Sequence, residues 1–149
     1  MGVTVLFHQF HRSDPINDQE ILAVEHYVAD ILKPLFAVLK DKNVGQLIGA
    51  SGTFDVLEAL LGEKGSALYT EIRAREYQPL YERIVRMTYQ ERLEMPGMPT
   101  IRADMIVVAL VLVRFVMERA SISKIMTSAY ALQEGMLVEM LQSPSPTST

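Results

Sequence analysis

Two segments of the chain have the pattern of a short strand that leads directly into a helix. Residues 44–48 are mostly apolar and pass through a glycine-containing turn into helical spacing from Thr53 to Leu61, which Gly62 ends. Residues 121–128 pass in the same way into helical spacing from Tyr130 to Leu141. Because strands that alternate with helices usually pair in parallel, this repetition predicts a layered α/β domain with parallel pairing.

The first forty residues predict one more strand and a long helix. Val3–Phe10 carries bulky side chains at alternating positions on both faces, which is typical of a strand in a sheet that is covered on both sides. Apolar residues then recur at helical spacing up to Leu39. This helix is expected to begin with the capping pair Asn17 and Glu20 and to be kinked or restarted at Pro34.

The rest of the chain predicts two further helices and a tail. The charged pattern of residues 69–95 predicts a helix with a solvated, mixed-charge face. Residues 102–119 predict a helix that is buried in the core, because its apolar run, Met105–Val113, is far shorter than the about 20 residues that span a bilayer. The Ser/Thr/Pro-rich residues 142–149 are expected to be disordered, which leaves residues 1–141 as one domain.

Composition excludes several classes of function. A chain of 149 residues has the size of one domain, and its formal charge of −4 and pI near 5.4 argue against a nucleic-acid-binding protein. The absence of cysteine excludes thiol catalysis, cysteine-based zinc sites and disulfides. Since the first residues do not resemble a signal peptide, we expect a cytoplasmic location with neither a nucleic-acid nor a membrane partner.

The turn LIGASGTFDVL, residues 47–57, has two interpretations. Glycines allow an anion to approach the amides of a helix N-terminus, and the hydroxyls of Ser51 and Thr53 add donors, so the turn suits phosphate. Alternatively, the turn is only a corner in which Thr53 caps the helix. Asp55 opposes phosphate binding unless its carboxylate points away. Taken alone, these residues favour the corner.

Three stretches in order resemble one family. They are Ile48–Thr53, the Arg102–Ile106 segment RADMI and the Ser128–Leu137 segment SAYALQEGML. Together they are similar to the second domain of the exopolyphosphatase / guanosine pentaphosphate phosphohydrolase family, in the actin-like ATPase superfamily. The similarity extends to about Leu141. It implies a partial RNase H-like α/β domain, with a mixed sheet and flanking helices, that forms one wall of a cleft between two domains.

The resemblance also implies a site. In that family the glycine turn contacts phosphates of polyphosphate or of a guanosine pentaphosphate-type nucleotide, and Mg²⁺ assists the attack of water on the terminal phosphoanhydride. Arg102 and Glu134 are weaker candidates for the cleft wall, and Arg102 equally suits a salt bridge at a helix start. The implied phosphate-contacting residues are Gly49, Ala50, Ser51, Gly52 and Thr53.

Parts of the family pattern have no counterpart in this sequence. The first domain with its catalytic glutamate, and the hairpin that opens the second domain, are not present, so no catalytic residue and no metal ligand is assigned here. We therefore expect the C-terminal half of a phosphohydrolase that is inactive alone, with its missing wall supplied by a companion chain. The alternative is a non-enzymatic module that binds a partner, or a second copy, through an open sheet edge.

Overall fold

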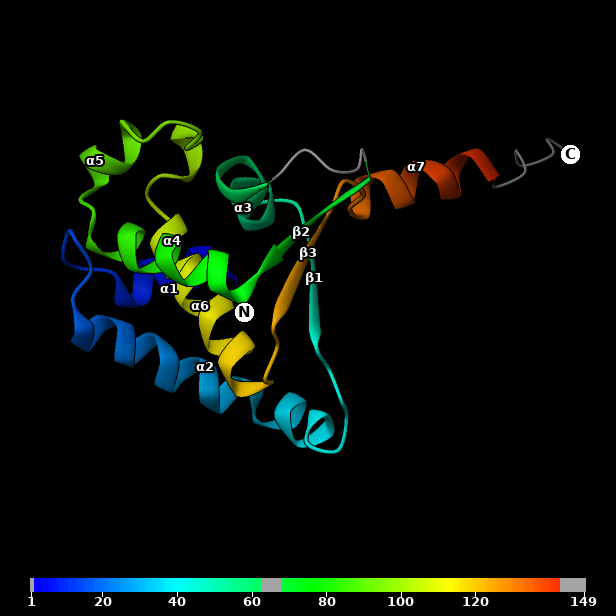
Figure 1. Ribbon diagram of the computed structural model, residues 1–149, viewed down its shortest axis with the longest axis horizontal. Coiled ribbons are helices and arrows are strands. Elements are labelled where there is room, and N and C mark those ends of the chain that lie inside the picture. Colours follow the sequence, from blue (N-terminus) through cyan, green and yellow to red (C-terminus); the bar gives the residue numbers. More distant parts are fainter. Residues whose placement is uncertain (1, 63–67, 143–149) are drawn as a thin grey trace, which may run out of the picture.

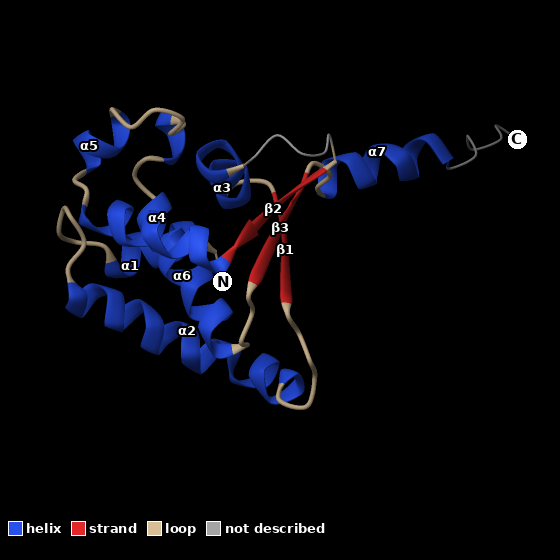
Figure 2. Ribbon diagram, viewed as in Figure 1, coloured by secondary structure: helices blue, strands red, loops and turns tan. Residues whose placement is uncertain are grey.

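The computed structural model describes residues 2–62 and 68–142, which form a layer of helices against a small sheet (Figures 1 and 2). The elements in chain order are α1 (Val3–Phe10), α2 (Asp18–Leu39), β1 (Gln46–Ala50), α3 (Thr53–Leu61), β2 (Tyr69–Arg73), α4 (Ala74–Arg86), α5 (Tyr89–Leu93), the 3₁₀ helix η1 (Thr100–Arg102), α6 (Ile106–Arg119), β3 (Lys124–Ser128) and α7 (Leu132–Gln142).

The central strand of the sheet is β3, with β1 on one side and β2 on the other. β1 pairs with β3 in parallel, as the sequence predicts, and Ala50 lies beside Ser128. β2 pairs with β3 antiparallel, so Arg73 lies beside Lys124 at the other end. The described strands thus form a mixed α/β arrangement in which the segments that follow β1 and β3 leave the sheet at the same edge.

The two faces of the sheet differ. α3 packs on the strands and α4 packs on β2, and the buried side chains of Ile72, Ile125 and Thr127 point toward these helices. On the opposite face Ile48 is 67% exposed. Figure 2 shows the helices gathered on one side of the strands, with α7 extending away from the body. The described part of the chain therefore covers only one face of the sheet.

The helical layer is centred on α6, which contacts α1, α2, α3 and α4. Nine of its 14 residues are buried, as expected for the apolar run that forms it. The Tyr77 hydroxyl on α4 donates a 2.6 Å hydrogen bond to the Leu110 carbonyl of α6. Arg114 of α6 forms an ion pair with Glu25 of α2. These polar contacts join α2 and α4 to α6 at the border of a mainly hydrophobic core.

The prediction of a strand over Val3–Phe10 is wrong, because these residues form helix α1. Leu6 is fully buried, and Val3, Phe7 and Phe10 pack against the core. These positions also fit the helical spacing i, i+3, i+4 and i+7, which β-branched and aromatic residue types made easy to mistake for alternation. Since α1 packs on α2 and α6, it takes no part in the sheet.

The prediction of one helix over residues 69–95 is also wrong at its start and near its end. Tyr69–Arg73 is strand β2, in which Thr70 and Ile72 are buried and the residues between them are exposed. This period of two was hidden by the charged helical pattern that follows it. The helix then stops at Arg86, and the capping box of Thr88 and Glu91 begins the separate helix α5.

Several expected boundaries change by a few residues. α6 begins at Ile106, after η1, rather than at residue 102. The Asn17–Glu20 capping box of α2 is confirmed, and α2 is assigned as one helix through Pro34 without a restart. The expected disordered tail lies almost entirely outside the described residues, apart from Gln142, which ends α7. Among the described residues, no helix has both the length and the apolar character needed to cross a membrane.

Candidate functional site

The glycine turn joins the end of β1 to the start of α3. Ser51 has φ +64° and Gly52 has φ +55°, so two consecutive residues adopt left-handed backbone conformations. Gly52 also has ψ −111°, a combination that residues with a Cβ rarely adopt. A Cβ built on Gly52 would meet no atom within 4 Å. Gly52 is therefore required by backbone conformation rather than packing, and it leaves open space beside the turn.

The second glycine of the turn has a different role. A Cβ on Gly49 would lie 2.2 Å from two ring atoms of Phe54, which is far inside van der Waals contact. Gly49 is buried in β1, and Phe54 packs against the core from the first turn of α3. Gly49 thus allows α3 to pack closely on the sheet, which is a structural requirement whether or not the turn binds a ligand.

The N-terminus of α3 carries no side-chain cap. Gly52 is the N-cap residue and Thr53 is the first helical residue, so the expectation that Thr53 caps the helix is wrong. The Phe54 amide is bonded to the Ser51 carbonyl over 3.1 Å. A helix start without a capping side chain retains the partial positive charge that attracts anions. Asp55 is exposed in the first turn and remains the one feature there that opposes an anion.

The third family-like stretch begins beside the turn. Because Ala50 and Ser128 are partners in the parallel pair, the turn after β1 and the turn after β3 share one edge of the sheet. The Ser128 hydroxyl donates to the Tyr130 carbonyl over 2.9 Å. The Glu134 carboxylate accepts a 2.7 Å hydrogen bond from the Ala131 amide. This hydrogen bond lowers the pKa of Glu134 and gives its carboxylate a structural role at the start of α7.

Arg102 lies elsewhere, on η1 before α6. Among the described residues no hydrogen bond or ion pair joins Arg102 to residues 49–53 or to Glu134. The three family-like stretches follow one another along the chain, but the structure places the middle stretch, which begins at Arg102, in the helical layer. The next residue, Ala103, is fully buried and accepts a hydrogen bond from Arg92.

Arg92 is a structural residue that the sequence pattern did not identify. Its side chain is 1% exposed, its Nε donates to the Ala103 carbonyl over 2.7 Å, and its Nη1 donates to the Met87 carbonyl. Its Nη2 lies 3.4 Å from the Asp14 carboxylate, which also accepts the Tyr89 amide. A single guanidinium thus joins the segments before α2, before α5 and before α6.

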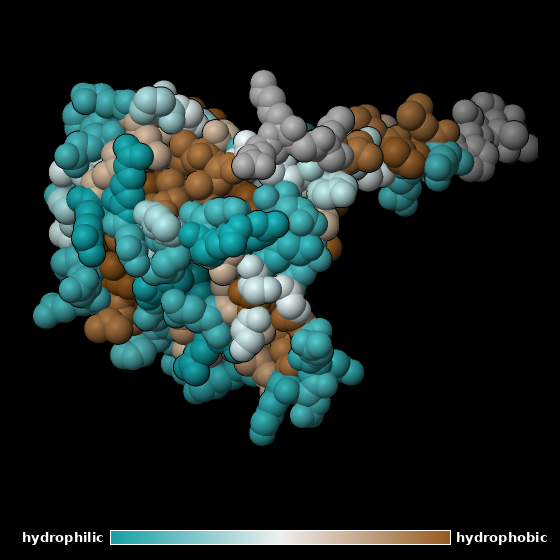
Figure 3. Space-filling model, in the orientation of Figure 1, coloured by the Kyte–Doolittle hydropathy of each residue, from teal (hydrophilic) through white to brown (hydrophobic). Residues whose placement is uncertain are grey.

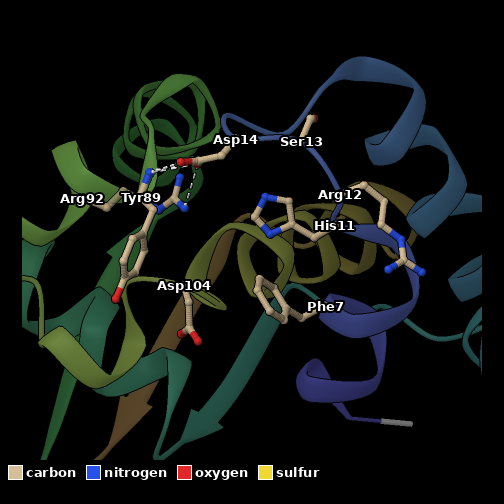
Figure 4. Close-up of a pocket in the computed structure, with 8 residues that line it drawn as sticks. All are labelled: Phe7, His11, Arg12, Ser13, Asp14, Tyr89, Arg92 and Asp104. Carbon is tan, nitrogen blue, oxygen red and sulfur yellow. Dashed lines mark hydrogen bonds and ion pairs between the residues drawn. The ribbon is translucent and has the colours of Figure 1, made fainter.

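The Arg92 cluster borders a pocket of about 390 Å³ (Figure 4). In that view the His11 and Phe7 rings lie on one side and Tyr89 and Asp104 on the other, while Arg12 points away. Burial and then the charge of Arg92 lower the pKa of His11, which favours the neutral form of its imidazole. The Asp104 carboxylate accepts the Met105 amide over 2.7 Å. Because Arg92 and Asp14 already bond to each other and to the backbone, we assign this cluster to stability.

No metal centre is formed by the described residues, since they contain no group of three or more His, Asp or Glu side chains close enough to hold an ion. At one end of the sheet the parallel strands β1 and β3 stop side by side and α3 begins after β1, which is the kind of position where α/β proteins commonly bind ligands.

Comparison with known proteins identifies the family. The model of the Ppx/GppA phosphatase family matches residues 1–144, and the chain therefore belongs to that family, which is part of the actin-like ATPase superfamily. This confirms the family that the three sequence stretches predict.

Solved structures share the fold. An exopolyphosphatase from Cytophaga hutchinsonii is 34% identical, with a TM-score of 0.83 over 95% of this chain and 47% of that protein. The Aquifex aeolicus member of the Ppx/GppA family is 18% identical, with a TM-score of 0.79 over 94% of this chain and 46% of that protein. The chain thus spans about half the length of these solved relatives.

Proposed function

We propose that the chain supplies one wall of the substrate cleft of an exopolyphosphatase-type phosphohydrolase. The substrate class is a phosphoanhydride chain, either polyphosphate or the phosphates of a guanosine pentaphosphate-type nucleotide. The observation that carries this proposal is the N-terminus of α3, which has no capping side chain and follows the open, positive-φ residue Gly52. It lies at the edge where β1 and β3 end, in a chain that matches the family over residues 1–144.

The proposed contribution of residues 49–53 is binding rather than bond cleavage. Backbone amides and the hydroxyls of Ser51 and Thr53 would hold phosphate oxygens and offset their charge. Hydrolysis also requires a base that orients water and a second set of groups on the other side of the phosphate. The described residues contain no cluster of three or more side chains that could hold an ion, so the substrate phosphates would supply part of the Mg²⁺ coordination.

Reconstitution tests this proposal. The chain is mixed with the part of the Cytophaga hutchinsonii exopolyphosphatase that it does not cover, and phosphate release from polyphosphate is measured with Mg²⁺. We expect release from the mixture and none from either half. The same mixture with Gly52→Val should release less, because a Cβ distorts the turn. Stable association of the halves with no phosphate release would contradict the proposal.

A second candidate function is that of a non-enzymatic binding module. Apolar side chains are exposed along α7, where Leu132 is 78% and Leu141 is 85% exposed, and Figure 3 shows this apolar helix projecting from the body. Ile48 adds an exposed apolar side chain on β1, which is an outer strand of the described sheet. Such surfaces favour association. Concentration-dependent self-association in light scattering that polyphosphate does not change would support this alternative over the first.

A further inference from the structure

A second group of hydrogen-bond donors lies at the end of the sheet opposite the glycine turn. A pocket of about 660 Å³ opens there, where β1 and β3 begin and β2 ends. Gln46, Lys124 and Arg73 are neighbours across the three strands. Their positions alternate with the buried residues Ile125 and Ile72, so their side chains share the face of the sheet that the described helices leave open.

The pocket is lined by cationic and neutral polar side chains without a carboxylate. Arg73, Arg75 and Lys124 contribute three positive charges, and Gln46 and Ser123 contribute neutral polar groups. The Nε2 atom of Gln46 is enclosed by protein and has no hydrogen-bond partner among the residues that the structure describes. An enclosed amide donor without an acceptor is energetically costly.

Two carboxylates lie just outside the pocket and compensate part of this charge. Glu71 is 3.0 Å from Lys124, and both side chains are substantially exposed. Glu76 accepts the Arg73 amide over 2.8 Å and lies 4.0 Å from the Nε of Arg75. Ion pairs that are this exposed are weak and readily exchanged for a stronger acceptor. The guanidinium of Arg73 forms no ion pair with any described residue.

We propose that this pocket, which we call the basal pocket (Gln46, Arg73, Arg75, Ser123 and Lys124), binds a segment of a linear inorganic polyphosphate chain. Guanidinium groups bind phosphate oxygens in a bidentate manner, and the closely spaced anions of polyphosphate match three adjacent cations. The inference rests on the proposed function, because it assigns a second contact for the substrate held at residues 49–53.

Distance makes the second contact dependent on chain length. Five strand residues at about 3.3 Å each separate the two ends of the sheet by roughly 15 Å. A triphosphate is too short to occupy both ends, whereas a long polyphosphate chain can reach from the turn to the basal pocket over the open face. A long chain should therefore gain affinity from both sites, and a short one should not.

The test measures binding of inorganic triphosphate and of long-chain polyphosphate to the full chain. The basal variant carries Arg73→Gln, Arg75→Gln and Lys124→Gln. Its matched control carries Lys33→Gln, Arg83→Gln and Arg86→Gln, which remove the same charge elsewhere. We expect the basal variant to bind the long chain at least tenfold more weakly than wild type, the control to change less than twofold, and triphosphate binding at the turn to be equal in all three.

A single-substitution variant and a competing oligonucleotide distinguish loss of polyphosphate binding from loss of folding and from unspecific binding of polyanions. If the triple variant does not fold by circular dichroism, Arg73→Glu alone should weaken long-chain binding, because it reverses the unpaired charge. Equal long-chain affinity in the basal variant and its control overturns the inference. So does displacement of polyphosphate by an equally charged single-stranded oligonucleotide, which would indicate an unspecific polyanion surface. If Gly52→Val abolishes triphosphate binding while the basal variant binds long chains normally, the basal pocket fails and the proposed function stands.

Discussion

The backbone of Gly49 lies against the ring of Phe54, so that a Cβ at residue 49 would be 2.2 Å from the ring atoms Cδ1 and Cε1. The two glycines of the turn are therefore required for different reasons. Gly49 is required because α3 packs closely on β1, whereas Gly52 is required by a backbone conformation in open space. Only the surroundings of Gly52 are free for a ligand, which focuses the proposed phosphate contact on residues 51–53.

Gly49→Ala should therefore destabilise the fold. The new methyl group must displace the Phe54 ring, and overpacking of this kind costs about 1–3 kcal/mol. The free energy of unfolding in urea measures the effect. Gly45→Ala is the matched control, since a Cβ there meets nothing within 4 Å, and it should change stability by less than about 0.5 kcal/mol. The double variant Gly49→Ala/Phe54→Leu should recover part of the loss, and no recovery would contradict the assigned contact.

Replacement of Arg92 should be among the most destabilising single changes. Arg92→Met leaves the buried Ala103 carbonyl without its donor and removes the contacts to Met87 and Asp14. Orphaned buried acceptors cost about 1–3 kcal/mol each, so a loss of about 3 kcal/mol is expected in urea unfolding. Arg83→Met, at an exposed position of α4, serves as the control and should have little effect. If Arg92→Met unfolds with wild-type stability, the structural assignment of the Arg92 cluster is wrong.

Ser51→Gly should separate stability from phosphate binding. Ser51 has φ +64°, and relief of this left-handed conformation should stabilise the fold by about 1 kcal/mol. The same change removes the hydroxyl that the proposed function assigns to phosphate, so affinity for triphosphate should fall. Ser121→Gly is a matched control. Ser121 also has a positive φ, of +54°, but it lies before the start of β3, whereas the turn lies beside the end of β3. It should raise the melting temperature without changing phosphate affinity.

Glu20 should make the start of α2 sensitive to acid. Burial by itself raises the pKa of Glu20, but hydrogen bonds from the Ser13 side chain and from the Asn17, Ser13 and Arg12 backbone hold it below the ordinary 4.5. A carboxyl with a lowered pKa contributes stability that is complete above its unfolded-state pKa and is lost as pH falls through the folded-state value. The stability difference between wild type and Glu20→Gln should therefore be constant above pH 4.5 and shrink below it. A difference that persists unchanged at lower pH would contradict this.

The sequence predicted the strand-to-helix turns better than it predicted the segments that form α1 and β2. The α3 boundaries, the α2 capping box and the buried α6 follow from local spacing and end signals, which are short-range. Val3–Phe10 and Tyr69–Arg73 failed because their tertiary neighbours decide their conformation. α1 is held by α2 and α6, while β2 is held by the edge of β3.

The candidate site was predictable only in part. The turn at residues 49–53 has a local signal in its glycines, and its proximity to Ser128 follows from parallel pairing. Arg92 has no such signal, because it lies within a charged stretch and its acceptors come from three separate segments, of which the one with Asp14 is 78 residues away. The basal pocket likewise depends on the register of β2 against β3, which the sequence did not reveal.

The most direct test of the central claim is a residue-resolved titration of the ¹⁵N-labelled chain with inorganic triphosphate. If residues 51–53 form a phosphate-binding turn, the amide signals from Ala50 to Asp55 should shift progressively and saturate. The Val28 amide, in the buried part of α2, should not move. Gly52→Val should remove the shifts while the remaining spectrum stays folded. Triphosphate that leaves the amides of residues 50–55 unchanged at millimolar concentration would contradict the account and leave the turn as a structural corner.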